Sequence, residues 1–476
     1  HDYTWILGSL PNDIGSNSGG TMLDFNFDPP KATYFSLPAP TLGPYKSISD
    51  SNGSLLFYTN ACDMFNRNHE QLQNGEKVNF GKIYERYCIQ LDDGYPSAQG
   101  WLTIPAPFDK EKYIAVYLSI DEENFYSKHI LYSIIDNNEA PNMGTVVQKN
   151  EVVMQDTALQ DLLSAVRHAN GRDWWIVVPR AIEPYGIFTI LLSPEGFGQP
   201  AFYPVLPHLY IEINGQACFS PDGKKYCINH GAFIYIFDFD RCYGTFSNMQ
   251  SWQLPIDNSV NFTAGGIAVS PNSEYVYVST GSKVHQYNLK VSDIESTRII
   301  LTETLDSQIT YVNLTLAPDK KIYGMPFGTS DRLHVIHQPN EKGVACQLEP
   351  HAFKLPTKTW IFLPYFPSYR LYDEVGSPCD TICKNDPGKG SPYTAAGIEV
   401  FPNPTRDNLK FKLPLCPCGN WEIFNIAGVL MHTFPANSQD GAYYELNVGH
   451  WPSGVYVLRG NTKDNAAYAR RFVVVK

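Results

Sequence analysis

The chain has 476 residues, 43% hydrophobic and 18% charged, which is enough apolar content for a substantial core in two or three domains. Its formal charge of −12 argues against a nucleic-acid partner, because such a surface needs clustered Lys and Arg. No apolar run approaches the roughly eighteen residues that cross a bilayer, so no transmembrane segment is expected. Aromatic residues at 13%, together with 35 Gly and 35 Pro, favour β-structure. An all-β protein is therefore predicted.

The N-terminal third contains three weak copies of a strand–turn–strand pattern, at residues 47–58, 101–117 and 165–178. The first copy has Asn52-Gly53 at its turn, which is a strong hairpin signal. The only stretch with helical spacing is short, at residues 157–166.

The middle of the chain repeats this pattern clearly, at residues 219–226, 269–275 and 316–323. The turn prolines are Pro221, Pro271 and Pro318, which lie 50 and 47 residues apart. Proline fixes φ at the first turn position, and Asp, Asn or Gly suits the tighter position that follows. A period of roughly forty to fifty residues with several strands per repeat is typical of a β-propeller.

These six copies predict that residues 1–375 form a seven-bladed β-propeller, with six or eight blades as alternatives. Residues 359–362 would pair with residues 21–25, so that the N- and C-terminal strands close the ring in a shared blade. Residues 376–396 are rich in Gly, Pro, Asp and Lys and are predicted to be a linker. Residues 397–476 contain short alternating strands between turns, which predicts a small Ig-like β-sandwich.

The tail carries a set of motifs at characteristic spacing. It resembles the C-terminal sorting domain, type A, of proteins exported by the type IX secretion system of the Bacteroidota. The resemblance rests on Pro402, Asn403, Pro404, Gly428, Gly454, Tyr456, Arg470, Arg471 and Lys476.

The resemblance implies a secreted, extracellular protein at the outer cell surface. Its expected partners are the type IX secretion translocon and an outer-membrane shuttle barrel, followed by a surface sortase and a lipopolysaccharide anchor. Residues 1–375 also resemble secreted proteins of the same phylum, notably at residues 2–8 and 167–175. That second resemblance implies a fold and an extracellular location, but it does not indicate which reaction, if any, the protein catalyses.

Ten cysteines in a secreted chain predict disulfides rather than metal ligands. No metal or cofactor is expected. Cys62 is expected to pair with Cys88, because both are distant from the other cysteines. The remaining candidates are Cys218 with Cys227 across a hairpin, the Cys379 and Cys383 pair, and the Cys416 and Cys418 pair.

The densest polar cluster lies near residue 170, and in a propeller such a cluster can bind a sugar or an acidic group. Its candidate ligand-binding residues are Arg167, His168, Arg172, Asp173 and Trp174. The same residues also fit a turn with paired charges and two Trp packed between blades. No nucleophile elbow, zinc-protease motif or P-loop occurs, so no catalytic residue is assigned.

Thr157 and Thr381 resemble the acceptors of O-glycosylation in the same bacteria, each within an Asp-Thr-aliphatic triplet. Together these features predict a secreted cell-surface binding or structural protein that engages a glycan, another protein or further copies of itself. A glycan-active hydrolase or lyase and an extracellular filament subunit are the alternatives.

Overall fold

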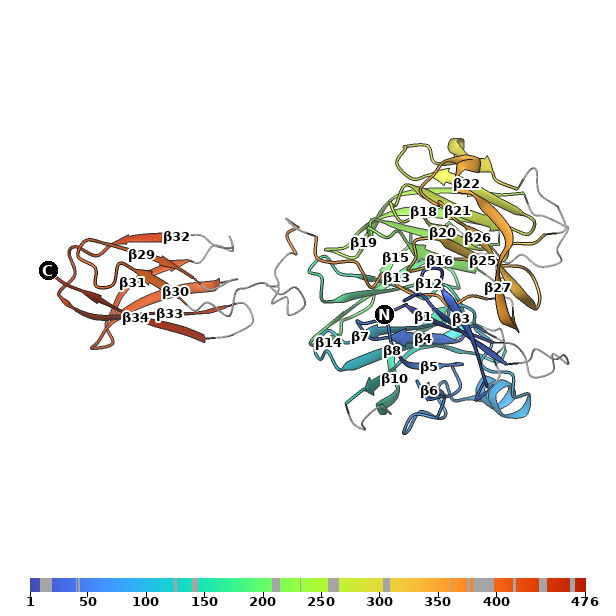
Figure 1. Ribbon diagram of the computed structural model, residues 1–476, viewed down its shortest axis with the longest axis horizontal. Helices are drawn as coiled ribbons and strands as arrows, with labels where there is room; N and C mark the ends of the chain where they lie inside the picture. Colours follow the sequence, from blue (N-terminus) through green and yellow to red (C-terminus); the bar gives the residue numbers. More distant parts are fainter. Residues whose placement is uncertain are drawn as a thin grey trace. The chain divides into compact units, whose positions relative to one another are not determined.

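The computed structural model of the chain divides into two compact units, His1–Cys379 and Asp380–Lys476, called here the propeller unit and the tail unit. Both are built from antiparallel strands (Figure 1), which confirms the all-β prediction. The structure describes residues 1–8, 19–39, 41, 43–123, 126–138, 144–207, 215–231, 233–255, 265–302, 309–360, 362–374, 377–379, 398–413, 417–435, 443–462 and 467–476.

The first half of the propeller unit begins with two three-stranded sheets. These are β1 (Thr4–Leu7), β2 (Gly20–Asp24) and β3 (Lys31–Phe35), then β4 (Lys46–Ser49), β5 (Leu55–Thr59) and β6 (Met64–Asn66). A nine-stranded sheet follows, made of β7 (Trp101–Pro105), β8 (Lys112–Ile120), β9 (Ser127–Asp136), β10 (Thr145–Ala158), β11 (Ser164–Arg167), β12 (Trp174–Arg180), β13 (Gly186–Ser193), β14 (Gly196–Phe197) and β15 (Ala201–Tyr203). Its two halves, β7 to β10 and β11 to β15, meet at the single residue pair Ala158–Arg180.

The second half consists of three four-stranded sheets. They are β16 (Gly215–Phe219), β17 (Lys225–His230), β18 (Phe233–Asp240) and β19 (Thr245–Gln253); β20 (Ile267–Val269), β21 (Tyr275–Thr280), β22 (Lys283–Asn288) and β23 (Ile299–Ile300); and β24 (Asn313–Leu316), β25 (Ile322–Met325), β26 (Ser330–Ile336) and β27 (Leu348–Thr359). Short helical turns are α1 (Lys82–Tyr84), η1 (Glu85–Gln90), η2 (Glu295–Thr297) and η3 (Gly343–Cys346). Within the described ranges, no helix has the length and apolar content to cross a membrane.

The sheets are arranged as in a β-propeller, because their first strands converge. β1 contacts β4, β4 contacts β7, β11 contacts β16, β16 contacts β20, and β20 contacts β24. Central strands such as β21 are buried along their whole length, whereas outer strands such as β19 are largely exposed. Neighbouring sheets therefore bury both faces of their inner strands against one another, and the apolar core lies between the sheets.

The predicted pairing of the two ends of this unit is wrong. Among the described residues, β2 pairs with β1 and β3, and β27 pairs with β26, so no strand ladder joins β2 to β27. Hydrogen bonds between separate sheets link the two ends instead: the backbone N–H of Trp360 and the hydroxyl of Thr359 both donate to the carbonyl of Gly8. The short stretch with helical spacing, residues 157–166, contains the end of β10 and the start of β11.

The tail unit has two antiparallel sheets around one apolar core. One sheet contains β28 (Glu399–Phe401), β29 (Asn408–Lys412) and β32 (Tyr443–Asn447); the other contains β31 (Leu430–Pro435), β30 (Pro417–Asn425), β33 (Gly454–Thr462) and β34 (Ala467–Val474). Trp421, Leu458 and Phe472 are fully buried in this core. Alternating apolar residues on facing strands thus close a two-layer structure.

Candidate functional site

The repeated proline turns surround a cavity where the first strands end. Pro221, Pro271 and Pro318 all line this cavity of about 510 Å³, which we call the axial pocket. Each proline is followed two positions later by a residue with positive φ: Gly223 at 71°, Ser273 at 57° and Lys320 at 67°. The turn chemistry visible in the sequence therefore builds three sides of the pocket's rim.

Below the rim, the wall of the axial pocket is mostly apolar. It consists of side chains from the ends of β16, β20 and β24, including Phe219, Val269 and Leu316. A cavity of this size, with an apolar wall and a few polar groups, is typical of small-ligand sites.

The other side of the pocket is formed by a segment that we call the strap, residues 362–374 and 377–379, which follows β27. The ring of Phe366 stacks on Trp5, with centroids 6.0 Å apart. The hydroxyl of Tyr369 donates to the carbonyl of Thr103 at 2.5 Å. The strap is thus fixed to the sheets of β1 and of β7, far from it in the sequence.

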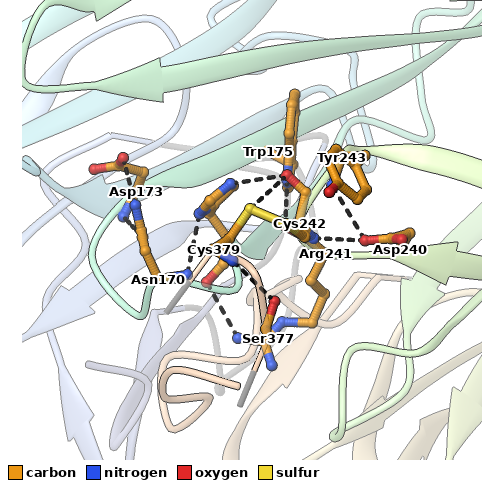
Figure 2. The surroundings of a disulfide bond; sticks show 10 residues. Asn170, Asp173, Trp175, Asp240, Arg241, Cys242, Tyr243, Ser377 and Cys379 are labelled. Atoms are coloured by element: carbon orange, nitrogen blue, oxygen red, sulfur yellow. Dashed lines mark hydrogen bonds between the residues drawn. A yellow bond between two sulfur atoms is a disulfide. The ribbon is translucent and has the colours of Figure 1, made fainter. Parts of the chain in front are cut away.

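The far end of the strap is fixed to the sheets of β11 and β16. The Cys242–Cys379 disulfide joins it to the turn between β18 and β19, across a sequence separation of 137. Figure 2 shows Trp175, Asp240 and Arg241 around this bond. The guanidinium of Arg241 donates to the carbonyls of Arg167, His168 and Tyr372, which joins the strap to the turn between β11 and β12.

The charged groups that line the axial pocket are Asp2, Arg370 and Lys320. Arg370 makes a bidentate ion pair with Asp2, at 2.7 and 2.8 Å, and its guanidinium lies 4.9 Å from the ring centre of Tyr3. Burial lowers the pKa of Arg370, but the contributions of Asp2 and Tyr3 together raise it by more, so the pKa of Arg370 is raised overall. Lys320 also lines the pocket and is exposed, and its ammonium makes no ion pair with any described residue.

Behind the pocket, buried amides fill the space between the first strands. The side-chain carbonyl of Gln216 accepts from the N–H groups of Ile267 and Leu314, and its amide donates to the carbonyl of Leu314 at 2.6 Å. Gln99 bonds in the same way to Ala217 and to the carbonyl of Leu163. The remaining hollow on that side is about 10 Å³, which is room for one water at most. Gln216 lines both this small hollow and the axial pocket.

The predicted ligand-binding cluster lies at the turn between β11 and β12, where its side chains bond mainly to one another. Arg167 lies 4.3 Å from the ring centre of Trp174 and donates to the carbonyls of Gly171 and Arg172. Burial lowers the pKa of Arg167 to about 10, and the charge of Arg241 adds to this effect.

The other members of the cluster are held in the same way. His168 contacts the carbonyl of Cys242 at 3.0 Å, and Arg172 pairs with Asp173. Of the five predicted residues, Arg172 has the most exposed side chain, at 41%, whereas Trp174 is fully buried. These residues do not line the axial pocket. Ligand binding by the cluster stays a prediction.

The cysteine predictions divide into confirmed and wrong pairs. Cys62–Cys88 is a disulfide, as expected. Cys379 pairs with Cys242, which had no predicted partner, and not with Cys383, which lies outside the described residues. Cys416 also lies outside them, and the side chain of Cys418 is not described.

Cys218 and Cys227 face each other across β16 and β17, but both are free thiols. Ser220 N–H donates to the carbonyl of Lys225, so by alternation Cys218 and Cys227 occupy a hydrogen-bonded position of the ladder. Such positions hold the Cα atoms about 5.5 Å apart, with the side chains farther apart than at non-hydrogen-bonded positions. A disulfide needs Cβ atoms about 3.8 Å apart, so this register disfavours one.

The sorting-motif residues occupy defined positions in the tail unit. The side-chain carbonyl of Asn403, between Pro402 and Pro404, accepts from Val473 N–H at 2.9 Å. Gly428 has φ of 80° at the turn between β30 and β31. Tyr456, two residues after Gly454, stacks on Phe472. Arg470 and Arg471 lie exposed on β34, and Lys476 N–H bonds to Ser453.

The two predicted glycosylation sites are placed differently. Thr157 is half-buried on β10, beside an Asp156 that pairs with Arg180. Thr381 lies outside the described residues. Sequence reasoning missed Arg370, since nothing local marks it, whereas Asp2, Tyr3 and Lys320 lay in segments already noted for other reasons.

Comparisons with solved structures return low similarity over most of the chain. AztD from Citrobacter koseri is 12% identical with a TM-score of 0.37, over 76% of this chain and 88% of that one. The Cps50 (Swd1) β-propeller domain of Myceliophteria thermophila is 10% identical with a TM-score of 0.35, over 68% and 94%. An extracellular domain of a putative hybrid two-component system from B. thetaiotaomicron is 9% identical with a TM-score of 0.41, over 100% and 57%. These scores lie below 0.5, so the propeller-like architecture rests on the sheet topology.

No curated protein matches the chain. Residues 399–475, in contrast, match the family described as "Secretion system C-terminal sorting domain". This range covers all the strands of the tail unit and contains every sorting-motif residue except Lys476. Residues 399–475 are therefore a C-terminal sorting domain of the type IX secretion system, which directs the protein to the cell surface or extracellular space.

Proposed function

We propose that the propeller unit is a seven-bladed β-propeller that binds a ligand in the axial pocket at the outer cell surface. The proposed blades are β1 to β3, β4 to β6, β7 to β10, β11 to β15, β16 to β19, β20 to β23 and β24 to β27. The tail unit would be an Ig-like sandwich. The pocket itself is the observation that carries the proposal: it has a volume of about 510 Å³ and is lined by prolines from three turns.

The pocket's chemistry favours binding over hydrolysis. A glycoside hydrolase normally uses two carboxylates about 5 to 10 Å apart. Among the described residues that line the axial pocket, Asp2 alone has a carboxylate, and Arg370 holds both of its oxygens. A small ligand or the end of a glycan chain fits the volume, so binding is the function that this geometry supports best.

The sorting domain supports a second part of the proposal, concerning partners. The tail unit would engage the translocon and the shuttle barrel, and a surface sortase would then replace it with a lipopolysaccharide anchor. Self-association on the surface, up to a filament, stays a prediction that electron microscopy of the native surface would test.

The binding proposal can be tested by filling the axial pocket of the full-length protein. Ser368 is half-buried on the strap and lines the pocket, so Ser368→Trp adds an indole inside it. We expect this variant to weaken binding of the neutral fluorescent probe N-phenyl-1-naphthylamine at least about tenfold, a loss of about 1.4 kcal/mol.

The control is Ser368→Ala, which leaves the cavity open and should bind the probe as the parent does. Near-ultraviolet circular dichroism should show the same fold in all three proteins. Equal binding by the Trp variant would refute the pocket as the ligand site.

A further inference from the structure

The charges lining the axial pocket differ in sign from those of the unit that contains it. Residues 1–379 have 26 Lys and Arg against 40 Asp and Glu, a net charge of −14. The pocket is lined by two cations, Arg370 and Lys320, and one carboxylate, Asp2. We propose that the axial pocket selects an anionic ligand with an apolar or ring-shaped body, and that Lys320 holds its charged group. This inference rests on the proposed function and adds the ligand class.

Lys320, rather than Arg370, has the uncompensated charge. Asp2 occupies both terminal nitrogens of Arg370, so their charges largely cancel. Asp319, the acid next to Lys320 in the chain, is already occupied by other groups. Asp319 accepts from the hydroxyl of Tyr323 at 2.7 Å and lies 3.8 Å from Lys321.

The acid at the turn between β16 and β17, two sheets away from Lys320, is occupied in the same way. Asp222 accepts from Ser220 and lies 3.7 Å from Lys290. The pocket therefore has one net positive charge, and an entering anion would find one cation without a partner. A single cation beside a low-dielectric wall focuses the field where the ligand enters.

The backbone at Lys320 is consistent with a role for its side chain. Its φ of 67° lies in the left-handed region, which costs an ordinary residue about 1 kcal/mol and costs glycine nothing. The turn at Pro221 has Gly223 at the equivalent position. The turn at Pro318 thus has a lysine where the backbone favours glycine, and this lysine places its ammonium at the rim of the axial pocket.

The remaining wall suits a hydrophobic or ring-shaped body. Phe219, Phe366 and Val269 line the pocket beside Pro271 and Pro318, and flat apolar surfaces of this kind pack against rings. A carboxylate or sulfonate would then lie at the Lys320 end, while the body lies against the prolines. A ring acid from an acidic glycan and an aromatic acid share this chemistry.

The experiment compares two probes that differ in one charged group, on the full-length protein. 1-Anilinonaphthalene-8-sulfonate has a sulfonate that N-phenyl-1-naphthylamine lacks. We expect Lys320→Gln to weaken the sulfonate probe about three- to tenfold and to leave the neutral probe unchanged. Lys320→Arg should retain the parent affinity. Lys110→Gln is the matched control, because Lys110 is a 90% exposed lysine at the turn between β7 and β8.

The outcomes separate this inference from the proposed function. If Ser368→Trp blocks both probes while Lys320→Gln affects neither, the pocket binds ligands but does not select anions, and the inference fails. If Ser368→Trp blocks neither probe, the pocket is not the site and both proposals fail. If the charge effect is found, the ability of glucuronate and of benzoate to displace the sulfonate probe is compared, and the better competitor identifies the source of the ligand as a glycan acid or an aromatic acid. The inference would be overturned if neutral glucose or benzyl alcohol displaced the probe as effectively as the acids.

Discussion

The two units of this protein are both antiparallel, yet their interiors differ in kind. The core of the tail unit is mainly apolar, with Trp421, Ile423 and Leu458 fully buried. The propeller unit instead buries amides where its first strands converge, including Gln99 and Gln216. First strands of neighbouring blades do not pair by backbone ladders, so their buried N–H and C=O groups need side-chain partners. A two-layer sandwich has no such axis and needs none.

The units also differ in charge and covalent support. Residues 380–476 have ten Lys and Arg against eight Asp and Glu, compared with 26 against 40 in the propeller unit. Both disulfides found among the described residues, Cys62–Cys88 and Cys242–Cys379, lie within the propeller unit. The propeller unit should therefore be the more sensitive to redox state and to pH.

The largest expected effect follows from opening the strap disulfide. Cys379→Ser removes the disulfide that closes a loop of 137 residues, which stabilises the fold by about 5 kcal/mol through loop entropy. The Cys62–Cys88 disulfide closes a loop of 26 residues and contributes about 3.5 kcal/mol by the same estimate. We expect the free energy of unfolding of the propeller unit to fall by about 3 to 5 kcal/mol in urea titrations. Cys88→Ser is the control and should cost less. The contrast between the two units would be refuted if Cys379→Ser also made the tail unit unfold at a lower urea concentration.

Next in size is the loss of the axial amide. Gln216→Leu keeps similar bulk but leaves the N–H groups of Ile267 and Leu314 and one carbonyl without partners. Each unsatisfied buried group costs about 1 to 3 kcal/mol, so we expect a total loss of about 3 kcal/mol. Amide hydrogen exchange should become faster in β20 and β24 and remain unchanged in β30 and β33. If the variant were as stable as the parent protein, the region where the first strands converge would tolerate unpaired backbone groups.

Local patterns in the sequence were informative about the turns. The spacing of Pro221, Pro271 and Pro318 predicted the strand–turn–strand units. All three prolines also line the axial pocket, which was not predicted. Local chemistry fixes such turns, because φ limits and Asx bonding act over two or three residues.

The strap was not predictable in this way. The Arg370–Asp2 pair spans 368 residues and the strap disulfide spans 137, and periodicity says nothing about which distant side chains meet. The cluster at residues 167–175 was found by its density of polar side chains. The number of polar residues in this turn could not show that Arg241 already donates hydrogen bonds both to the turn and to the strap.

A third prediction concerns pH. Burial lowers the pKa of Lys46 from 10.5 to about 7, although the charge of Asp161 acts in the opposite direction. Between about pH 7 and 10 the unfolded chain then binds more protons at this group than the folded chain, so the free energy of unfolding rises with pH. The group contributes at most about 1.4 kcal/mol per pH unit.

Lys46→Met should therefore flatten the stability profile of the propeller unit above pH 7. Lys46 belongs to the propeller unit, so the stability profile of the tail unit should not change and serves as an internal reference. Chemical denaturation from pH 6 to 9.5 measures both. A variant with an undiminished slope would show that Lys46 remains charged when buried.

The smallest effect is expected at the hairpin tip of the tail unit, where the apolar residues face water. Ile426 is 82% exposed and Val429 is 55% exposed, on either side of Gly428. The backbone of this turn is held by the side-chain carbonyl of Asn425, which accepts from Ala427 and Val429. Ile426→Ser with Val429→Ser should therefore change the free energy of unfolding by less than about 0.5 kcal/mol.

Trp421→Ala, in the core of the same unit, should cost about 3 to 5 kcal/mol and calibrates the assay. The tip variant should also elute earlier from a hydrophobic-interaction column, because it removes exposed apolar surface. A large loss of stability in the tip variant would mean that these side chains support the fold. An unchanged stability would mean that the tail unit exposes apolar surface which its own fold does not need.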